Sequence, residues 1–326
     1  MALPTRSFAS LRMTAEGRMQ IGSFMKFNSC NARLLSLVLA FLACFAAQAA
    51  AEPADLKVMS FNVRFAKAGH SEAATENNWD DAKHPRRERA IRVIRDGSPD
   101  LLGVQEARAE QVKDLQAAFP EYAFYGVGRD DGKMGGELSG IFYRKDRFTQ
   151  KDAGTFWLSD TPEKPGTTFS FNGLPRVASW VRLLDGKSGR EFVLLNQHWD
   201  HQDESAREKA AALARQQLTA IAKGAPTIVM GDLNSFEDTK AFQTLVSADD
   251  AGRKLADSYR ELHPKRLPNE VSFNSWNGKK KGSRIDFILH TDDFTAAAAE
   301  IDRTSYDGLW PSDHYPVTAT LRFTGE

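Results

Sequence analysis

The chain has 326 residues, with 43 basic and 43 acidic side chains, so its formal net charge is zero at neutral pH. This balance lacks the basic excess that proteins use for tight binding to duplex nucleic acid. The two cysteines, Cys30 and Cys44, both lie near the start of the chain. A disulfide framework in the remaining residues is therefore excluded.

The first 51 residues are typical of an export leader rather than of a folded domain. An apolar run from Leu34 to Phe45 follows a basic flank. The run is too short to cross a bilayer as a helix, but it has the length of a signal-peptide core. Small residues come next, and we expect cleavage after Ala49 or Ala51.

This leader leaves alternatives open. Translation could start at Met25, because residues 1–24 add nothing that a signal peptide needs. Cys44 could instead be acylated in a lipoprotein, or the apolar run could remain as an uncleaved anchor. The leader has five basic residues and one acidic residue, so the chain without it is mildly acidic. We expect a monomer that is periplasmic or secreted and has no stable membrane span after processing.

Residues 52–326 are long enough for one large core, and we expect a single domain of the mixed α/β class. Short β-branched and aromatic runs are interleaved with helix-periodic segments. The predicted strands are residues 56–65, 100–105, 122–128, 139–144, 178–184, 191–199, 226–232, 284–290 and 316–323. The predicted helices are residues 86–97, 109–119 and 204–224.

Carboxylates and amides follow or begin several predicted strands. Each one has an ordinary explanation as an Asx-turn or a helix start. Together they offer the oxygen ligands that a hard cation such as Mg²⁺ prefers. The residues are Asn62, Glu106, Asp232, Asn234 and Asp286. Because α/β folds build sites at strand ends, we expect Mg²⁺ or Mn²⁺ there.

A further polar group, in the sequence SDHYP (residues 312–316), precedes the final predicted strand. Its ordinary interpretation is a turn that begins at Asp313 and ends at Pro316. Its chemical interpretation combines a carboxylate for the cation with His314, which can carry a proton near neutral pH.

Two histidines and an aspartate stand close together in NQHWDH (residues 196–201). The segment differs by one residue from the HxHxDH motif of two-zinc hydrolases, with Asn196 in place of the first histidine. Such a site needs further imidazole or cysteine ligands, and the mature chain has neither a second histidine cluster nor a cysteine. The oxygen-rich set favours Mg²⁺ or Mn²⁺ over zinc. On a strand, His198 and Asp200 would share one face, and Trp199 would pack on the other.

Six motifs together resemble the endonuclease/exonuclease/phosphatase superfamily. In chain order they are FNVR with Asn62, VQEA with Glu106, NQHWDH with His198, GDLNS with Asp232 and Asn234, SRIDFIL with Asp286, and SDHYP with Asp313 and His314. The resemblance spans residues 56–323. It implies a four-layer sandwich of two packed mixed β-sheets flanked by helices. It also implies hydrolysis of a phosphodiester or phosphomonoester by in-line attack of water.

For the metal, the resemblance implies that Glu106 binds a divalent cation, helped by Asn62 and Asp313. The expected ion is Mg²⁺ or Mn²⁺. A non-catalytic binding module on the same fold is the alternative from another class. Retention of the whole polar set argues against that alternative.

For the chemistry, the resemblance implies that Asp232 orients or activates the attacking water and that Asn234 holds the phosphate. His314, oriented by Asp286, would act as a base or stabilise the transition state. His198 would lie on the opposite side of the phosphorus.

Other segments are similar to an exported bacterial branch of the superfamily, among them GVGRDDG (residues 126–132) and LPRVASW (residues 174–180). Gln197 departs from that branch, which commonly has threonine at this position. Glutamine still offers hydrogen bonds, so we expect the site to remain functional.

Four more residues are candidates for contact with the substrate. Arg176 and Arg207 could bind phosphate or form surface salt bridges, while Asp200 and His201 could bind substrate or only brace His198. The lysine run at residues 279–281 could touch an anion, although such runs are usually solvated. The sequence leaves open a small phosphorylated substrate, a phosphodiester, or DNA or RNA as a nuclease substrate.

Overall fold

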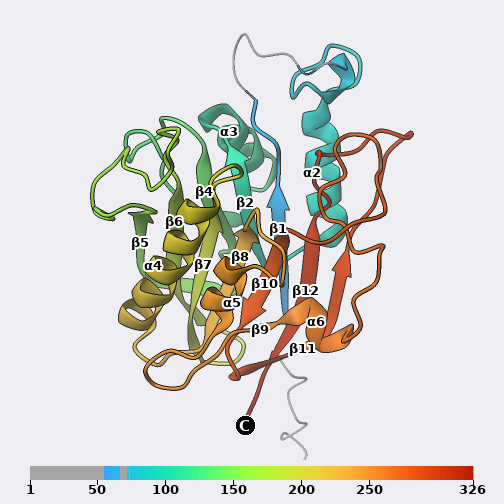
Figure 1. Ribbon diagram of the computed structural model, residues 1–326. Helices are drawn as coiled ribbons and strands as arrows, with labels where there is room; N and C mark the ends of the chain where they lie inside the picture. Colours follow the sequence, from blue (N-terminus) through green and yellow to red (C-terminus); the bar gives the residue numbers. More distant parts are fainter. Residues whose placement is uncertain (1–54, 67–71, 73, 326) are drawn as a thin grey trace, which may run out of the picture. The chain divides into compact units, whose positions relative to one another are not determined.

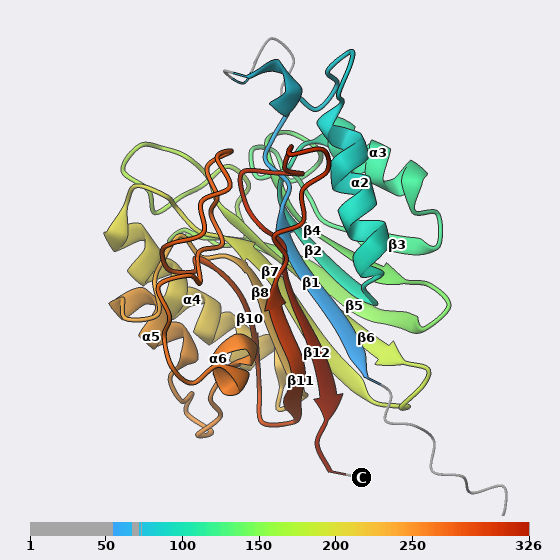
Figure 2. The ribbon, with the colours of Figure 1, turned by 90° about the vertical axis from the view of Figure 1, so that its right-hand side faces the viewer.

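The computed structural model describes residues 55–66, 72 and 74–325 (Figure 1). The expected leader, its cleavage site and the alternatives for Cys44 lie outside the described residues. Two six-stranded sheets pack face to face, and helices cover the outer face of each sheet (Figure 2). The predicted four-layer sandwich is therefore confirmed. Within the described part of the chain, no helix has the length and apolar character needed to cross a membrane.

The first sheet has the order β11-β12-β1-β2-β4-β3. Its strands are β1 (Leu56–Asn62), β2 (Leu101–Ala107), β3 (Tyr122–Tyr125), β4 (Leu138–Arg144), β11 (Phe294–Ile301) and β12 (Val317–Phe323). Only β1 and β2 are parallel neighbours among these strands, and the other pairs are antiparallel. The two parallel strands end at the same edge, which places Asn62 and Glu106 close together.

The second sheet has the order β5-β6-β7-β8-β10-β9. Its strands are β5 (Phe148–Trp157), β6 (Val177–Asp185), β7 (Glu191–His198), β8 (Thr227–Asp232), β9 (Ala256–Asp257) and β10 (Asp286–His290). Here β7 and β8 are parallel, and β10 runs antiparallel to β8. Asp232 pairs with His198 on one side and with Asp286 on the other. Three polar residues thus stand in a row at this edge.

Alternation along the strands buries both faces of each sheet. In β1, Leu56 and Val58 face the core between the sheets, whereas Met59 and Phe61 pack under the outer helices. Each such side chain contributes roughly 2 kcal/mol to folding. The first sheet is covered by α2 (Arg86–Gly97) and α3 (Ala109–Ala118), and the second by α4 (Glu204–Ala222) and α5 (Lys240–Val246). The remaining short elements are η1 (Thr75–Asn77) and α6 (Ser258–Leu262).

Every strand and helix predicted from the sequence is present, most of them with ends shifted by one or more residues. The prediction misses β5, β9 and β11, as well as α5 and α6. The middle of β5 is polar and exposed, and β11 contains a run of alanines, which favours helix. Both strands lie at a sheet edge. Edge position explains why their apolar pattern is weak.

Asn196, at the position of the missing zinc-motif histidine, lies between the two sheets and is fully buried. Its Nδ2 donates to the carbonyl oxygens of Val104 and Gly140, at 2.9 and 2.7 Å. Its Oδ1 accepts from Nε2 of Gln105 at 2.7 Å. These bonds join β7 to β2 and β4 and satisfy buried polar groups. Asn196 therefore has a structural role.

Candidate active site

The ends of the central strands of both sheets meet around a cavity of about 620 Å³. The residues predicted from the sequence that line it are Glu106, Arg176, His198, His201, Asp232, Asn234, Asp313 and His314. Asn62 and Asp286 are fully buried and contact this set from behind. Glu106 comes from the first sheet, whereas His198 and Asp232 come from the second, so the site depends on how the sheets pack.

A bulge in β2 aims Glu106 into the cavity. The register between β2 and β4 shifts between Val104 and Ala107, and Glu106 has a φ of 60°. A bulge re-aims a side chain, and this backbone conformation costs a non-glycine residue about 1 kcal/mol or more. The carboxylate accepts hydrogen bonds from Nδ2 of Asn62 at 2.9 Å and from the backbone nitrogen of Phe65 at 3.2 Å.

Asn62 links carboxylates that belong to different sheets. Its Nδ2 donates to Oε1 of Glu106 and to Oδ2 of Asp232, at 2.9 Å in both cases. Burial, followed by the charge of Asp286, raises the pKa of Asp232 to about 7. A carboxylate with a pKa near neutrality is suited to accepting a proton during catalysis.

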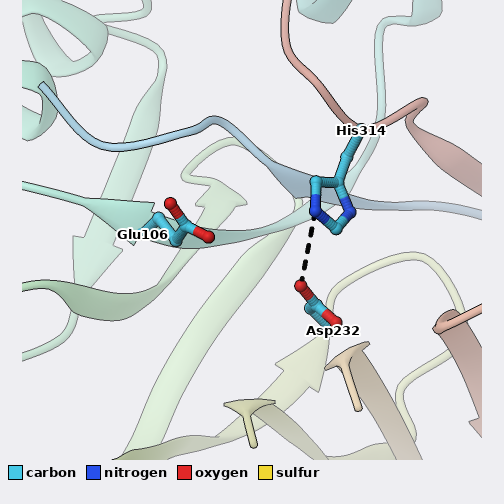
Figure 3. Close-up of side chains that lie close together, drawn as sticks. All are labelled: Glu106, Asp232 and His314. Carbon is cyan, nitrogen blue, oxygen red and sulfur yellow. Dashed lines mark ion pairs between the residues drawn. The ribbon is translucent and has the colours of Figure 1, made fainter. Parts of the chain in front are cut away.

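His314 lies between two carboxylates, and Figure 3 shows it beside Asp232 with Glu106 across the site. Its Nδ1 is 3.0 Å from Oδ2 of Asp286, and its Nε2 is 3.7 Å from Oδ2 of Asp232. Burial alone would lower its pKa, but the charges of Asp286 and Asp232 raise the pKa of His314 to about 10. At neutral pH the imidazole is therefore a cation that faces the cavity.

Arg176 contacts both histidines of NQHWDH. Its Nη1 is 2.9 Å from Nδ1 of His198, and its Nη2 is 3.0 Å from Nδ1 of His201. A guanidinium can only donate, so these ring nitrogens accept. Burial and the charge of Arg176 lower the pKa of both histidines. A cation in this position opposes the binding of zinc by the same nitrogens, so the geometry argues against the two-zinc alternative.

His198 and Asn234 complete this side of the cavity. Nε2 of His198 is 3.6 Å from Oδ2 of Asp232 and 3.1 Å from Nδ2 of Asn234. Asn234 has a φ of 46°, and its backbone nitrogen donates to Oδ1 of Asp232 at 3.0 Å. Trp199 packs beneath α4, as predicted. The tight turn after β8 therefore places the Asn234 amide beside His198.

Asp200 and Arg207 are not among the residues that line the cavity. Because β7 ends at His198, Asp200 belongs to the following loop and does not continue the strand alternation. Its Oδ1 accepts from the backbone nitrogens of Gln202 and Asp203, at 2.8 and 2.7 Å. Nη1 of Arg207 donates to the carbonyl oxygen of Asp200 at 2.9 Å. For both residues the geometry favours bracing of the loop over contact with the substrate, the other alternative that the sequence leaves open.

Several cavity residues have no role in the sequence prediction. Arg64 has its Nη1 3.6 Å from Oε2 of Glu106 and its Nε 3.7 Å from Oδ2 of Asp313. Arg129 and Glu137 form an ion pair on another part of the wall. The glycine-rich segment around Arg129 was the available signal, but a loop of this kind does not reveal from sequence where its side chains point.

Arg86, on α2, fastens the loops that carry the site. It is 1% exposed. Its Nε donates to the carbonyl oxygen of Asn77 at 2.7 Å, and its Nη2 to that of Arg64 at 2.9 Å. Its Nη1 donates to the carbonyl oxygens of Val63 and Pro311. One guanidinium thus ties the exit of β1 to the loop that leads into β12.

The donor set fits a divalent cation. Glu106, Asp232 and His314 each offer a ligand atom within 4.8 Å of the others. His314 is the least suitable of the three, because it is cationic and directs Nδ1 to Asp286. Asp313 adds a carboxylate whose pKa is raised by burial. Buried carboxylates in such proximity repel one another, and a hard cation with oxygen ligands would relieve that repulsion.

Comparison with known proteins gives consistent matches. A sequence model of the Endonuclease/Exonuclease/phosphatase family matches residues 59–314. A family protein from Bacteroides thetaiotaomicron is 31% identical, with a TM-score of 0.73 over 84% of this chain and 100% of that chain. A mannosyl-6-phosphatase of Bacteroides thetaiotaomicron VPI-5482 is 32% identical, with a TM-score of 0.72 over 82% of this chain and 100% of that chain.

A more distant relative is an uncharacterized protein of Acanthamoeba polyphaga mimivirus, which is 24% identical over 264 residues. The match covers 70% of this chain and 37% of the viral protein. The chain therefore spans little more than a third of that relative's length.

Proposed function

Because the chain belongs to the endonuclease/exonuclease/phosphatase family, we propose that it is a divalent-metal-dependent enzyme that hydrolyses a small phosphorylated substrate by in-line attack of water. The family hydrolyses phosphoester bonds, and the chain is a hydrolase of this class. The observation that carries the proposal is a chain of side-chain contacts across the site. It runs through Glu106, Asn62, Asp232, His314 and Asp286. These contacts join a candidate cation site to groups that can move or hold a proton.

In this mechanism Asp232 accepts a proton from the attacking water. Its raised pKa makes it a stronger base than an ordinary aspartate. Charge develops on the phosphoryl oxygens, and the cationic His314 stabilises it, which is the second of the two roles expected from the sequence. Asp286 holds the His314 ring through Nδ1. A bound cation, held by Glu106 and Asp313, would withdraw charge from the same oxygens.

The phosphate itself would be held from the opposite side. Asn234 offers an amide there, and His198 presents a neutral ring kept in place by Arg176. The guanidinium of Arg176 is 5% exposed, and its nearest carboxylate oxygen, on Asp200, is 4.0 Å away. A loosely neutralised, preorganised cation of this kind suits a phosphate oxygen.

A small substrate is favoured by the size of the cavity, about 620 Å³, which is typical of small-molecule sites. The similarity to a mannosyl-6-phosphatase supports a phosphomonoester as the substrate. Nucleic acid remains the alternative substrate class. The mildly acidic mature chain lacks the charge excess that would favour it.

The proposal is tested with the purified chain on p-nitrophenyl phosphate, bis-p-nitrophenyl phosphate, single-stranded DNA and a panel of phosphorylated metabolites. We expect hydrolysis with Mg²⁺ or Mn²⁺ and none in EDTA. Preference for a monoester over the diester and DNA would support the small-substrate proposal. Activity that survives complete chelation would refute metal dependence, and a preference for DNA would establish the nuclease alternative.

We also propose that the protein acts outside the cytoplasm, on the basis of the signal-like leader, and that it is a monomer there. Cell fractionation with N-terminal sequencing of the exported form tests this. We expect a new N-terminus near Ala49 or Ala51. Recovery of the intact chain in the cytoplasm would contradict export, and sedimentation as a dimer would contradict the monomer.

A further inference from the structure

Arg129 and Glu137 form an ion pair in the cavity wall, and the proposed mechanism gives neither of them a role. Nη1 of Arg129 is 2.7 Å from Oε2 of Glu137, and Nη2 donates to Oε1 at 3.0 Å. Their side chains are 10% and 12% exposed, and both line the cavity. Apolar residues often replace a buried ion pair without loss of stability. A contribution to stability alone therefore does not explain why this ion pair is present in the cavity wall.

The pair is held by a tightly built loop between β3 and β4. The backbone nitrogen of Arg129 donates to the carbonyl oxygen of Glu137 at 3.0 Å, and Nε1 of Trp157 donates to the carbonyl oxygen of Arg129 at 2.6 Å. A Cβ on Gly128 would lie 2.1 Å from the carbonyl oxygen of Gly135, so only glycine fits there. The two charged groups are thus preorganised rather than adaptable.

Phe273 and Trp276 line a different part of the cavity, from the loop that precedes β10. β4 packs on β6 and β7, whereas β10 packs on β1 and β12, so the two loops flank the central strands from opposite sides. The Phe273 ring is 37% exposed and lies 5.0 Å from the ring of His314, centroid to centroid. The reacting phosphate would therefore lie between a charged pair and an aromatic wall.

We propose that the Arg129–Glu137 pair binds neighbouring hydroxyls of a sugar whose phosphate this enzyme removes. The inference rests on the phosphoesterase function proposed above. Each nitrogen of the guanidinium fork keeps a second N–H, and each carboxylate oxygen keeps a free lone pair. Glu137 accepts from one hydroxyl, and Arg129 donates to the oxygen of the next. The apolar C–H face of the sugar packs against Phe273 and Trp276.

The hydroxyl pattern decides the substrate class. A flat aromatic leaving group offers the pair no partner, so binding it would desolvate the remaining N–H groups of Arg129 and lone pairs of Glu137 without giving them hydrogen bonds. A site built to bind a hydroxyl rejects the analogue that lacks it by up to about 10⁴-fold. The Arg129–Glu137 pair would therefore set specificity, while the groups around Asp232 perform the chemistry.

The test measures kcat/KM for glucose, mannose and galactose 6-phosphates and ribose 5-phosphate, each relative to p-nitrophenyl phosphate, with Mg²⁺ present. We expect the wild type to prefer at least one sugar phosphate by tenfold or more. Glu137→Gln should lower that preference by about 10- to 100-fold, as expected for loss of a hydrogen bond to a charged group. Arg129→Met should do the same, and Arg129→Lys should recover part of the preference.

Asp185→Asn is the matched control. Asp185 forms a buried bidentate pair with Arg147, at 2.9 and 3.1 Å, remote from the cavity lining. Its loss should affect stability and leave the substrate preference unchanged. If Glu137→Gln lowered kcat/KM equally for sugar and aromatic phosphates, the Arg129–Glu137 pair would be structural and the inference wrong.

A second measurement needs no variant. Deoxy analogues of the preferred sugar phosphate are compared with the parent on the wild-type enzyme, and we expect at least one to lose tenfold or more in kcat/KM. Equal rates for all analogues would overturn the inference. Hydrolysis of p-nitrophenyl phosphate without preference for any sugar phosphate would also overturn it while leaving the proposed function intact. Loss of both activities would refute the proposed function itself.

Discussion

Nδ1 of His314 lies 3.0 Å from Oδ2 of Asp286, and this contact joins the second sheet to the loop that leads into the first. Asp286 begins β10 of the second sheet, whereas His314 stands just before β12 of the first. The carboxylate fixes the orientation of the ring, as in the triads of other hydrolases. Packing of one sheet on the other therefore sets the direction in which the histidine presents its proton.

Asp286→Asn should reduce stability in a pH-dependent way. The folded protein raises the pKa of His314 from its ordinary 6.5 to about 10. The resulting stabilisation is fully present below about pH 6.5 and is lost as the pH rises through about 10. We expect the variant to lose about 3 kcal/mol at pH 6 and much less at pH 10.5. Urea unfolding in EDTA at several pH values measures this, and a constant difference across the range would contradict it.

Asp232→Asn should lower kcat by about 10² to 10⁴-fold, because the amide cannot accept the proton of water. In the wild type, the pKa of about 7 for Asp232 predicts that kcat/KM falls as the pH drops below 7. A divalent cation nearby opposes protonation, so higher Mg²⁺ should move this limb to lower pH. The measurement is a set of pH–rate profiles at two Mg²⁺ concentrations. Wild-type turnover by the variant would remove Asp232 from the mechanism.

Mg²⁺ should stabilise the folded chain through Glu106. A ligand at one hundred times its Kd adds about 2.7 kcal/mol of stability. We expect a Mg²⁺-dependent rise in Tm for the wild type and a much smaller rise for Glu106→Gln. Glu163→Gln, on an exposed loop, serves as the control and should respond like the wild type. An unchanged response of Glu106→Gln would place the cation elsewhere.

Arg86→Met should be strongly destabilising because it leaves buried carbonyl oxygens without donors. We expect a loss of about 3 kcal/mol or more in the free energy of unfolding. Arg87→Met removes the neighbouring, half-exposed arginine, which pairs with Asp80 at 2.5 Å, and should cost less than about 1 kcal/mol. Denaturant unfolding compares the two variants. Similar losses would mean that the Arg86 hydrogen bonds do not hold the loops.

Asn196→His restores the HxHxDH pattern. The variant tests whether this motif or its structural environment determines zinc binding. The larger ring cannot reproduce the hydrogen bonds to Val104 and Gly140, so we expect a loss of about 2 to 4 kcal/mol. We also expect no bound zinc, because Arg176 contacts His198 and His201. Metal analysis of protein purified without chelator provides the check. Stoichiometric zinc in the variant would contradict the assignment.

The strand-end residues could be predicted because they obey a simple geometric rule. Sites in α/β folds are built at strand ends, and because β1 and β2, like β7 and β8, are parallel neighbours, Asn62 lies beside Glu106 and His198 beside Asp232. The contact between the Asn62–Glu106 pair and the His198–Asp232 pair could not be predicted without knowing how the two sheets pack. The alternation of apolar residues predicts which side chains lie on each face of a strand, but not which element packs against that face.

Other features of the site could not be predicted, because they depend on tertiary contacts that no local sequence pattern reveals. Asn196 and Asp200 flank His198 in one short motif, yet one lies between the sheets and the other braces a loop. β7 ends at His198, so Asn196 lies within the strand and Asp200 lies in the loop after it. Arg129 meets Glu137 only through a loop closed by glycines. The sequence contains both residues but not the turn that brings them together.

Asn62 donates to one carboxylate from each sheet, and this has a consequence for folding. An intermediate with only one sheet formed would hold half of the candidate ligands and would bind a divalent ion weakly. Ion affinity therefore requires the two sheets to be docked on each other. Added Mg²⁺ should slow unfolding more than it speeds folding, because the site is complete only in the native state.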